Sequence, residues 1–439
     1  MRALGLMSGT SMDGIDVALV ETDGERVVAR GPNGTYPYLV PVRDELGAVV
    51  ADPHRGEHDP LPVLEAAVTD AHAYAVLRFL DEHGIDRAGL DLVGFHGQTV
   101  LHRPERRFTR QIGDGARLAR ALGVPVVNDF RTADVAAGGE GAPLVPLYHQ
   151  ALAADLDRPV AILNLGGVGN VTWLGDGPPL AFDTGPGNAM IDDWVRRHTG
   201  DAFDDRGALA ARGRVDELAL AALMANDYFH RPPPKSLDRN GFSADPVARL
   251  SPEDGAATLA AFTVATVAAA RRHLPVAPRR WLVTGGGRHN DGLMVGLGRA
   301  FNVPVDPVEA VGWNGDALEA EAFAFLAVRA SRGLPLSLPT TTGVPAPVTA
   351  GDGAAETQSE PSDGKERSDD GSVAHHQGAA AEAGQFASPA DTDDGHVWSE
   401  AGEHAGDVPQ RRPEQRRVPR RRRKHGEEQR MPTADGALE

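Results

Sequence analysis

The sequence predicts an α/β protein whose body has two lobes built on one plan, followed by a disordered tail. Across residues 1–345, short apolar runs alternate with stretches of helical periodicity, which is typical of α/β architecture. A unit of strand, glycine-rich turn and strand occurs near residue 5 and again near residue 163. This internal duplication indicates two similar lobes with a nucleotide in the cleft between them.

The first lobe is assigned to residues 1–130, and its elements follow the changes of hydrophobic period along the chain. Glycine marks some of their ends, as Gly123 does after a helix. The predicted elements are a hairpin of strands 4–7 and 15–20, a helix over 61–83, a strand over 92–96 that ends in a polar loop, a helix over 116–122 and a strand over 124–128.

The second lobe is assigned to residues 131–313, and a helix over 314–330 is expected to pack back on the first lobe. This helix is amphipathic from residue 316 onward. The other predicted elements are strands over 160–165, 171–174, 180–183 and 280–284, and helices over 189–198 and 256–272.

The C-terminal segment, residues 346–439, differs in composition from the rest. Gly, Ala, Ser, Asp and Glu dominate it, so it lacks the apolar surface needed to offset the entropy of ordering. It is therefore predicted to be disordered. Its basic block over 411–424 is either a tether to an acidic partner or nucleic acid, or part of an extension without function.

Composition excludes several classes of function. A net charge of −18 argues against general nucleic-acid binding, because a phosphate backbone repels such a surface. The chain has no cysteine, so disulfides, thiolate nucleophiles and Cys-ligated zinc are excluded, which fits a cytoplasmic protein. No signal peptide begins the sequence, and no apolar run is long enough to span a bilayer.

The hairpin turn near the N-terminus is the first candidate phosphate site. A P-loop is excluded because no lysine precedes Lys235, and the protein-kinase signatures fail for the same reason. Glycines let backbone N–H groups point at an anion, and an acid among them, Asp13, suits a Mg²⁺ ion. The alternative is an ordinary tight turn. The predicted nucleotide-binding residues of this turn are Gly9, Thr10, Ser11, Met12, Asp13, Gly14, Ile15 and Asp16.

Two further glycine-rich turns lie in the second lobe. Residues 164–170, with Gly166 and Gly167, occupy the place that corresponds to the N-terminal hairpin, and the pair is stronger support than either alone. The third turn follows a strand and suits close approach to an adenine or ribose, or is a plain strand-to-helix connection. Its predicted nucleotide-binding residues are Gly285, Gly286, Gly287 and Asn290.

Asp183 is the candidate general base, because a carboxylate at the end of a strand before a glycine-rich helix start faces a cleft. It competes with an N-cap role, for which Asn188 is better placed. Polar residues at other element ends are candidates for a sugar pocket. They are His96, Arg131, Asn188 and, at the start of the closing helix, Glu319; Gly185 is added because a glycine leaves room for a ligand.

Taken together, the motifs resemble those of anhydro-N-acetylmuramic acid kinases over residues 1 to about 345, and the likeness stops at the tail. The matching segments occur in order: 7–16, 94–99, 128–131, 164–167, 183–188, 235–240, 284–290 and 334–343. The resemblance implies a two-lobed, actin-like ATPase fold of the ribonuclease H-like kind.

The resemblance also implies an activity. Such an enzyme takes 1,6-anhydro-N-acetylmuramic acid, a product of murein turnover, with ATP and water. It opens the anhydro bridge and phosphorylates O6, giving N-acetylmuramic acid 6-phosphate and ADP. Carried onto this chain, residues 9–16 bind the phosphates, Asp183 takes the proton from water, and Glu319 assists. The family usually forms homodimers. From charge alone, Arg131 suits the lactyl carboxylate of the substrate.

Two alternatives remain at this point. The first is another sugar kinase of the same superfamily, which simple phosphorylation of free hexoses distinguishes from ring opening. The second is a scaffold switched by nucleotide, without enzymatic activity.

Overall fold

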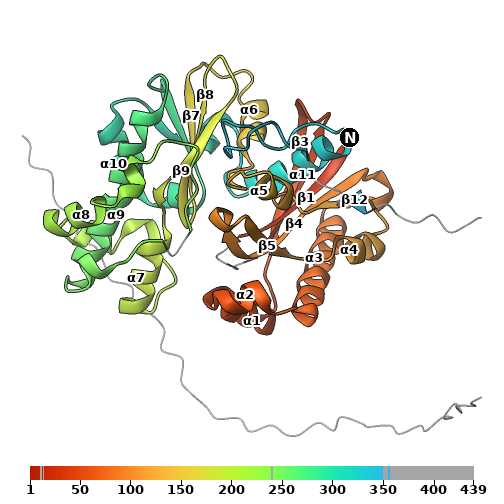
Figure 1. Ribbon diagram of the computed structural model, residues 1–439, viewed down its shortest axis with the longest axis horizontal. Coiled ribbons are helices and arrows are strands. Elements are labelled where there is room, and N and C mark those ends of the chain that lie inside the picture. Colours follow the sequence, from red (N-terminus) through yellow and green to blue (C-terminus); the bar gives the residue numbers. More distant parts are fainter. Residues whose placement is uncertain (10–11, 13, 239–240, 350–353, 356–439) are drawn as a thin grey trace, which may run out of the picture. The chain divides into compact units, whose positions relative to one another are not determined.

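Two β-sheets form the centre of the protein in a computed structural model that describes residues 1–9, 12, 14–238, 241–349 and 354–355 (Figure 1). Residues 1–362 cluster as one compact unit. The first sheet contains β1 (Arg2–Ser8), β2 (Ile15–Thr22), β3 (Val27–Tyr36), β4 (Leu92–Arg103), β5 (Phe108–Ile112), β6 (Val126–Asn128) and β12 (Ala354–Ala355). The second contains β7 (Val160–Leu165), β8 (Val168–Leu174), β9 (Leu180–Pro186), β10 (Arg280–Thr284) and β11 (Val305–Pro307).

The two sheets repeat one topology. The first runs β3-β2-β1-β4-β6 and the second β9-β8-β7-β10-β11. In each sheet, the three strands that come first in sequence pair antiparallel with one another. The two later strands join in parallel, on the opposite side of the first strand of that sheet. This duplicated order is the ribonuclease H-like plan of an actin-like protein. The predicted fold class and the predicted duplication are therefore confirmed.

Helices cover both sheets, and several begin with a side-chain cap. Asp114 accepts a hydrogen bond from Arg117 N at the start of α4, and Ser251 accepts one from Asp254 N at the start of α9. The helices are α1 (Val40–Ala51), α2 (Pro53–His58), α3 (Pro62–Glu82), α4 (Gly115–Leu122), α5 (Thr132–Ala136), α6 (Pro146–Leu152), α7 (Ala189–Thr199), α8 (Glu217–Met224), α9 (Pro252–Ala270), α10 (Asp291–Phe301) and α11 (Leu318–Ser331).

Helix α11 follows the second sheet in the chain but packs against β1, β2 and β4 of the first (Figure 1). The approach is close because Gly5 and Gly94, which are neighbours across β1 and β4, carry no side chain under the helix. A Cβ atom on Gly5 would lie 1.8 Å from Ala320 O, and one on Gly94 2.2 Å from Phe323 O. The glycine pair therefore sets the height of α11 above the sheet.

Three apolar cores hold this arrangement together. One lies between the first sheet and α1, α3 and α4, and another between the second sheet and α7–α10. The third contains residues of both sheets, such as Val20 and Ile162, around α6 and α11. No helix in the described part of the chain is long and apolar enough to cross a membrane.

The predicted elements differ from the observed ones mainly at strand ends. The strand predicted to stop at His96 continues to Arg103, because β5 folds back and pairs with its second half. The polar residues after His96 thus lie in a strand, and the prediction of a loop there was wrong. Within the segment predicted to be a disordered tail, Val348 bridges to Ser337, and β12 pairs with β6. The rest of that segment lies outside the described residues. The lobe boundaries remain predictions.

Candidate active site

Asp183 lies inside β9 and is only 7% exposed. One carboxylate oxygen, Oδ2, accepts a hydrogen bond of 2.8 Å from Leu237 N. Burial raises the pKa of Asp183 to about 7, although this hydrogen bond acts in the opposite direction. A carboxyl group with such a pKa exchanges protons near neutral pH, which is what a general base requires. Asp183 caps no helix, so the N-cap alternative is wrong.

The segment opposite Asp183 is held by a buried lysine. Lys235 is 2% exposed; its Nζ donates to Tyr228 O at 2.9 Å and lies 4.4 Å from the centroid of the Tyr228 ring. Backbone contacts join this pair to β9: Asp183 N donates to Lys235 O at 3.0 Å, and the Tyr228 hydroxyl donates to Asp183 O at 2.7 Å. The segment that contains Tyr228 and Lys235 therefore holds the backbone of Asp183 at both its N–H and its carbonyl oxygen.

Arg131 is the cation of the site. Its Nε donates to His96 Nε2 at 2.9 Å and its Nη1 to Gly141 O at 2.6 Å. His96 Nδ1 lies 2.8 Å from Gly97 O, so Nδ1 carries the ring proton and Nε2 accepts. Burial keeps the pKa of His96 well below its usual value, which agrees with a neutral ring. The positive charge of Arg131 interacts with both Asp183 and Glu319.

Glu319 lies in the first turn of α11 and accepts a hydrogen bond of 3.0 Å from Asn164 Nδ2 on β7. Burial raises its pKa above the usual value. The contact joins the helix that covers the first sheet to a strand of the second. The fold thus brings together three charged residues that lie far apart in the sequence. Arg131 interacts electrostatically with both Asp183 and Glu319.

The N-terminal hairpin is described in part, and Thr10, Ser11 and Asp13 lie outside the described residues. Three side chains fix the end of this hairpin that adjoins β1. Ser8 Oγ donates to Gln98 Oε1 at 2.5 Å, Tyr38 donates to Ser8 Oγ at 2.8 Å, and Gln98 Nε2 donates to Gly9 O at 3.1 Å. This network sets where the backbone of the turn leaves β1.

The other described residues of this hairpin have contacts of their own. Met12 takes a positive φ of 55° and donates its N–H to Gly9 O at 3.1 Å. Asp16, in β2 beside Ile15, accepts a hydrogen bond of 2.6 Å from the Thr35 hydroxyl. A Cβ on Gly14 would lie 2.6 Å from Thr35 Cγ2, so only glycine fits there without movement.

The two glycine-rich turns of the second lobe lie against each other. A Cβ on Gly285 would lie 2.3 Å from Asn164 Oδ1, and one on Gly287 2.5 Å from Leu165 Cβ. The turn at Gly166 and Gly167 is also tied to the end of β9, because Asn188 N donates to Gly166 O at 2.7 Å. One compact edge of the second sheet therefore carries both predicted nucleotide-binding turns.

Several predicted ligand-binding residues have partners within the chain. Asn188 holds the N-cap position of α7, as predicted, but its side chain makes no cap hydrogen bond, and Nδ2 donates instead to Leu165 O at 2.8 Å. Asn290 caps α10 through Leu293 N. A Cβ on Gly185 would lie 2.7 Å from Thr266 Cβ. Of the three glycines in the turn at 285–287, only Gly286 has room for a Cβ atom, which would make an ordinary van der Waals contact with Asn188. Ligand contact by these residues stays a prediction.

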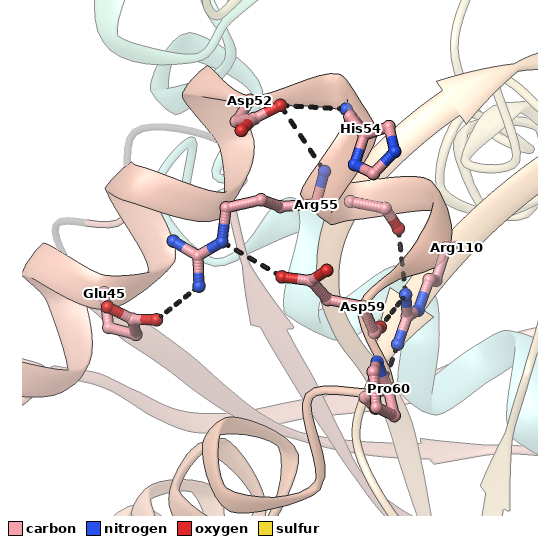
Figure 2. Close-up of polar contacts among 8 residues, drawn as sticks. Glu45, Asp52, His54, Arg55, Asp59, Pro60 and Arg110 are labelled. Carbon is pink, nitrogen blue, oxygen red and sulfur yellow. Dashed lines mark hydrogen bonds and ion pairs between the residues drawn. The ribbon is translucent and has the colours of Figure 1, made fainter.

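A cavity of about 270 Å³ lies beside His96, between the middle of β4, strand β5 and the C-terminal end of β6. His96, which was predicted to line a sugar pocket, borders it, as do Asp129 and Thr132 on either side of the predicted Arg131. Arg110 also lines it and donates to the carbonyl oxygens of Gly56, Asp59 and Pro60, so the C-terminal end of α2 is fixed to this wall (Figure 2). Arg55 joins Asp59 to Glu45 of α1.

Three polar residues of the site were not singled out in the sequence. Glu140 influences the charge of Asp183, and Gln98 holds the N-terminal hairpin. Arg288 is the third: it is buried, bonds to Glu309 at 2.9 Å and to Asp316 at 2.8 Å, and donates to Gly285 O. It therefore ties the third glycine-rich turn to the segment that leads into α11.

Gln98 provides a test of how the hairpin is positioned. We expect Gln98→Ala to raise the KM for ATP by about 3- to 10-fold with a smaller change in kcat, because the lost hydrogen bond to Gly9 O holds the turn rather than a reacting atom. Steady-state kinetics at varied ATP measures this. Gln150→Ala, at a half-buried position on α6, is the matched control; an equal effect there would contradict the assignment.

The chain matches the family model of anhydro-N-acetylmuramic acid kinase over residues 1–355. The Rhodospirillum rubrum protein of that name is 60% identical over 351 residues, covering 80% of this chain and 93% of that protein. The Paramagnetospirillum magneticum protein of the same name is 58% identical, covering 80% of this chain and 99% of that protein. Component A of the (R)-2-hydroxyglutaryl-CoA dehydratase of Acidaminococcus fermentans, a solved structure, gives a TM-score of 0.42 at 11% identity over 76% of this chain and 99% of its own. On the sequence matches, the chain belongs to the anhydro-N-acetylmuramic acid kinase family.

Proposed function

We propose that this kinase opens the 1,6-anhydro ring of 1,6-anhydro-N-acetylmuramic acid with water and transfers the γ-phosphoryl group of ATP to O6. The products are N-acetylmuramic acid 6-phosphate and ADP, a step of cell-wall recycling. The membership of the family supports the substrate. The observation that carries the chemistry is the buried carboxyl group of Asp183, whose pKa of about 7 suits a base at neutral pH.

Asp183 supplies the one proton transfer that the reaction needs. Ionised Asp183 takes a proton from water as the water oxygen bonds to C1 and the C1–O6 bond breaks. The freed O6 bonds to the γ-phosphorus, and the bond from that phosphorus to the bridging oxygen breaks, releasing ADP. Burial strengthens the base by removing the water that would stabilise its charge. The Leu237 N–H holds Oδ2 of the carboxylate, and we assign the other oxygen, Oδ1, to the proton of the attacking water.

ATP is assigned to the three glycine-rich turns, with its phosphates at residues 9–16. Phosphoryl transfer depends mainly on positioning and charge neutralisation, and backbone N–H groups supply both. Mg²⁺ would supply charge neutralisation at the phosphates. The described residues hold no cluster of three or more possible metal ligands, and Asp13 lies outside them. Asp13 is the proposed protein ligand.

The amino sugar is assigned to the region of Arg131 and His96. Arg131 has two of its N–H groups engaged by His96 and Gly141, and it lies within the electrostatic reach of Asp183 and Glu319. A fixed guanidinium suits the lactyl carboxylate of the substrate. We also propose a cytoplasmic homodimer, as the family resemblance implies.

The activity is tested by coupled measurement of ADP release with the anhydro sugar, and with N-acetylglucosamine and glucose as controls. We expect turnover with the anhydro sugar and little with the free hexoses. In water enriched in ¹⁸O, the heavy oxygen should enter C1 of the product during turnover. A product without solvent oxygen at C1 would contradict the hydrolytic step, and preferred turnover of free hexoses would indicate another sugar kinase.

A further inference from the structure

Glu140 lies in a short loop that is fixed at several points. Glu140 N donates to Thr342 O at 2.7 Å, and the N–H of the next residue, Gly141, donates to Asp134 Oδ1 at 2.7 Å. The Thr342 hydroxyl donates to the other carboxylate oxygen of Asp134 at 2.5 Å. Arg131 holds the same loop through Gly141 O. The backbone of Glu140 is therefore placed by contacts that do not involve its own side chain.

The side chain of Glu140 reaches the segment that holds the base. Ser236 Oγ donates to Glu140 Oε2 at 2.6 Å, and the next residue, Leu237, donates its N–H to Asp183 Oδ2 at 2.8 Å. Two carboxylates from distant parts of the chain are thus anchored by consecutive residues of one segment. The shared anchor agrees with the electrostatic interaction of Glu140 with Asp183.

The charges around Asp183 are of both signs. Arg131 and Lys235 favour its ionised form, and the negative charge of Glu140 opposes it. Two other titratable groups lie against this strand: Tyr228, whose hydroxyl donates to Asp183 O, and His273, whose ring contacts that of Phe182 in β9 at 5.8 Å. Two cations would by themselves make Asp183 a weaker base, because they stabilise the carboxylate. The negative charge of Glu140 counteracts them.

We propose that Glu140 is a positioning residue that acts through Asp183: its carboxylate, held by Ser236, makes Asp183 more ready to accept the proton of the attacking water. This inference rests on the proposed function and deepens it by naming what sets the strength of the base. A general base works best when its pKa lies near the pH at which the enzyme operates. Without Glu140, the two cations would leave Asp183 ionised but a poorer proton acceptor.

The test is the pH profile of kcat/KM for the anhydro sugar in Glu140→Gln. The amide keeps an oxygen that accepts from Ser236 and removes the charge. In the wild type the acid limb of this profile should lie near pH 7, the pKa of Asp183. In Glu140→Gln we expect the limb to move down by about 0.5 to 1 pH unit. The plateau rate should fall by about 2- to 10-fold because the base is weaker. Ser236→Ala, which releases the Glu140 side chain, should shift the limb less, in the same direction.

Glu217→Gln is the matched control, because it removes the same charge at an exposed position on α8. Its profile should superimpose on that of the wild type. A Glu140→Gln profile that coincides with the wild type, or that moves to higher pH, would overturn the proposal. Loss of a structural contact alone would lower the rate at every pH and leave the limb in place.

A second measurement does not need turnover. The carboxyl ¹³C resonance of Asp183, identified by its absence from Asp183→Asn, can be titrated in aspartate-labelled protein. Glu140→Gln should lower the titration midpoint of this resonance by a similar amount, and an unchanged midpoint would overturn the inference. Failure of the wild type to turn over the anhydro sugar would instead overturn the proposed function, so the two failures are distinguishable.

Discussion

Asp183→Asn should lower kcat for phosphorylation of the anhydro sugar by ~10²- to 10⁴-fold, the usual contribution of a positioned general base. Asparagine fills nearly the same space and keeps an oxygen that accepts from Leu237 N, but it cannot take a proton from water. ATP binding should be nearly unchanged, because the residues assigned to the phosphates lie in the hairpin turns. Steady-state kinetics and ATP titration measure the two quantities separately. A fully active variant would remove Asp183 from the proton transfer.

The same variant should be more stable than the wild type, which distinguishes lost chemistry from lost structure. The pKa of Asp183 rises from 3.8 to about 7 on folding, so its ionisation favours the unfolded chain. Ionisation of Asp183 therefore lowers the free energy of unfolding. This destabilisation is absent below about pH 4, grows as the pH rises toward 7, and is constant above pH 7. Asparagine removes it. We expect a gain of ~2 to 4 kcal/mol above pH 7 that disappears near pH 4, visible by thermal denaturation. A stability difference independent of pH would contradict the raised pKa.

Gly94→Ala should destabilise the protein by roughly 3 to 5 kcal/mol or prevent it from folding. The added Cβ would lie 2.2 Å from Phe323 O and 2.8 Å from Phe323 C. These are backbone atoms of α11, which no side-chain rotation can move aside. The helix must lift from the sheet, and the apolar contacts around Phe323 loosen. Thermal denaturation and the yield of folded protein measure the effect.

Gly47→Ala is the control for that substitution. Gly47 lies in α1, and a Cβ there would have no atom within 4 Å. Alanine in an exposed helix is favoured over glycine by about 0.5 to 1 kcal/mol, so this variant should be as stable as the wild type or slightly more so. Equal stability of the Gly47 and Gly94 variants would show that α11 does not depend on the glycine pair.

The duplicated fold was predictable because hydrophobic period and glycine turns are local features. The strands at residues 4–7 and 160–165 each precede a glycine-rich turn and a return strand, and both units form as expected. Strand ends were less predictable. β4 extends beyond His96 because it pairs with β5, and such pairing depends on a partner that periodicity alone does not reveal.

The candidate site was predictable where a carboxylate stood beside glycines, as Asp183 does, or where a guanidinium stood in a polar loop, as Arg131 does. Their mutual placement with Glu319 is given only by the fold, because the three lie on β9, before α5 and on α11. Glu140 carried no signal in the sequence. It stands in an ordinary loop, and its importance arises from a hydrogen bond to Ser236, 96 residues away. Local patterns cannot indicate such a contact.

The position of α11 also has a consequence for how the chain emerges from the ribosome. The first sheet has its strands β1–β6 by residue 128, yet the helix that covers the Gly5–Gly94 surface is encoded at residues 318–331. At about 5 to 20 residues per second, translation takes roughly 10 to 40 s to pass from one to the other. Until α11 is made, the face of β1, β2 and β4 that it covers lacks this partner, so that face is the last part of the first sheet to be buried during synthesis.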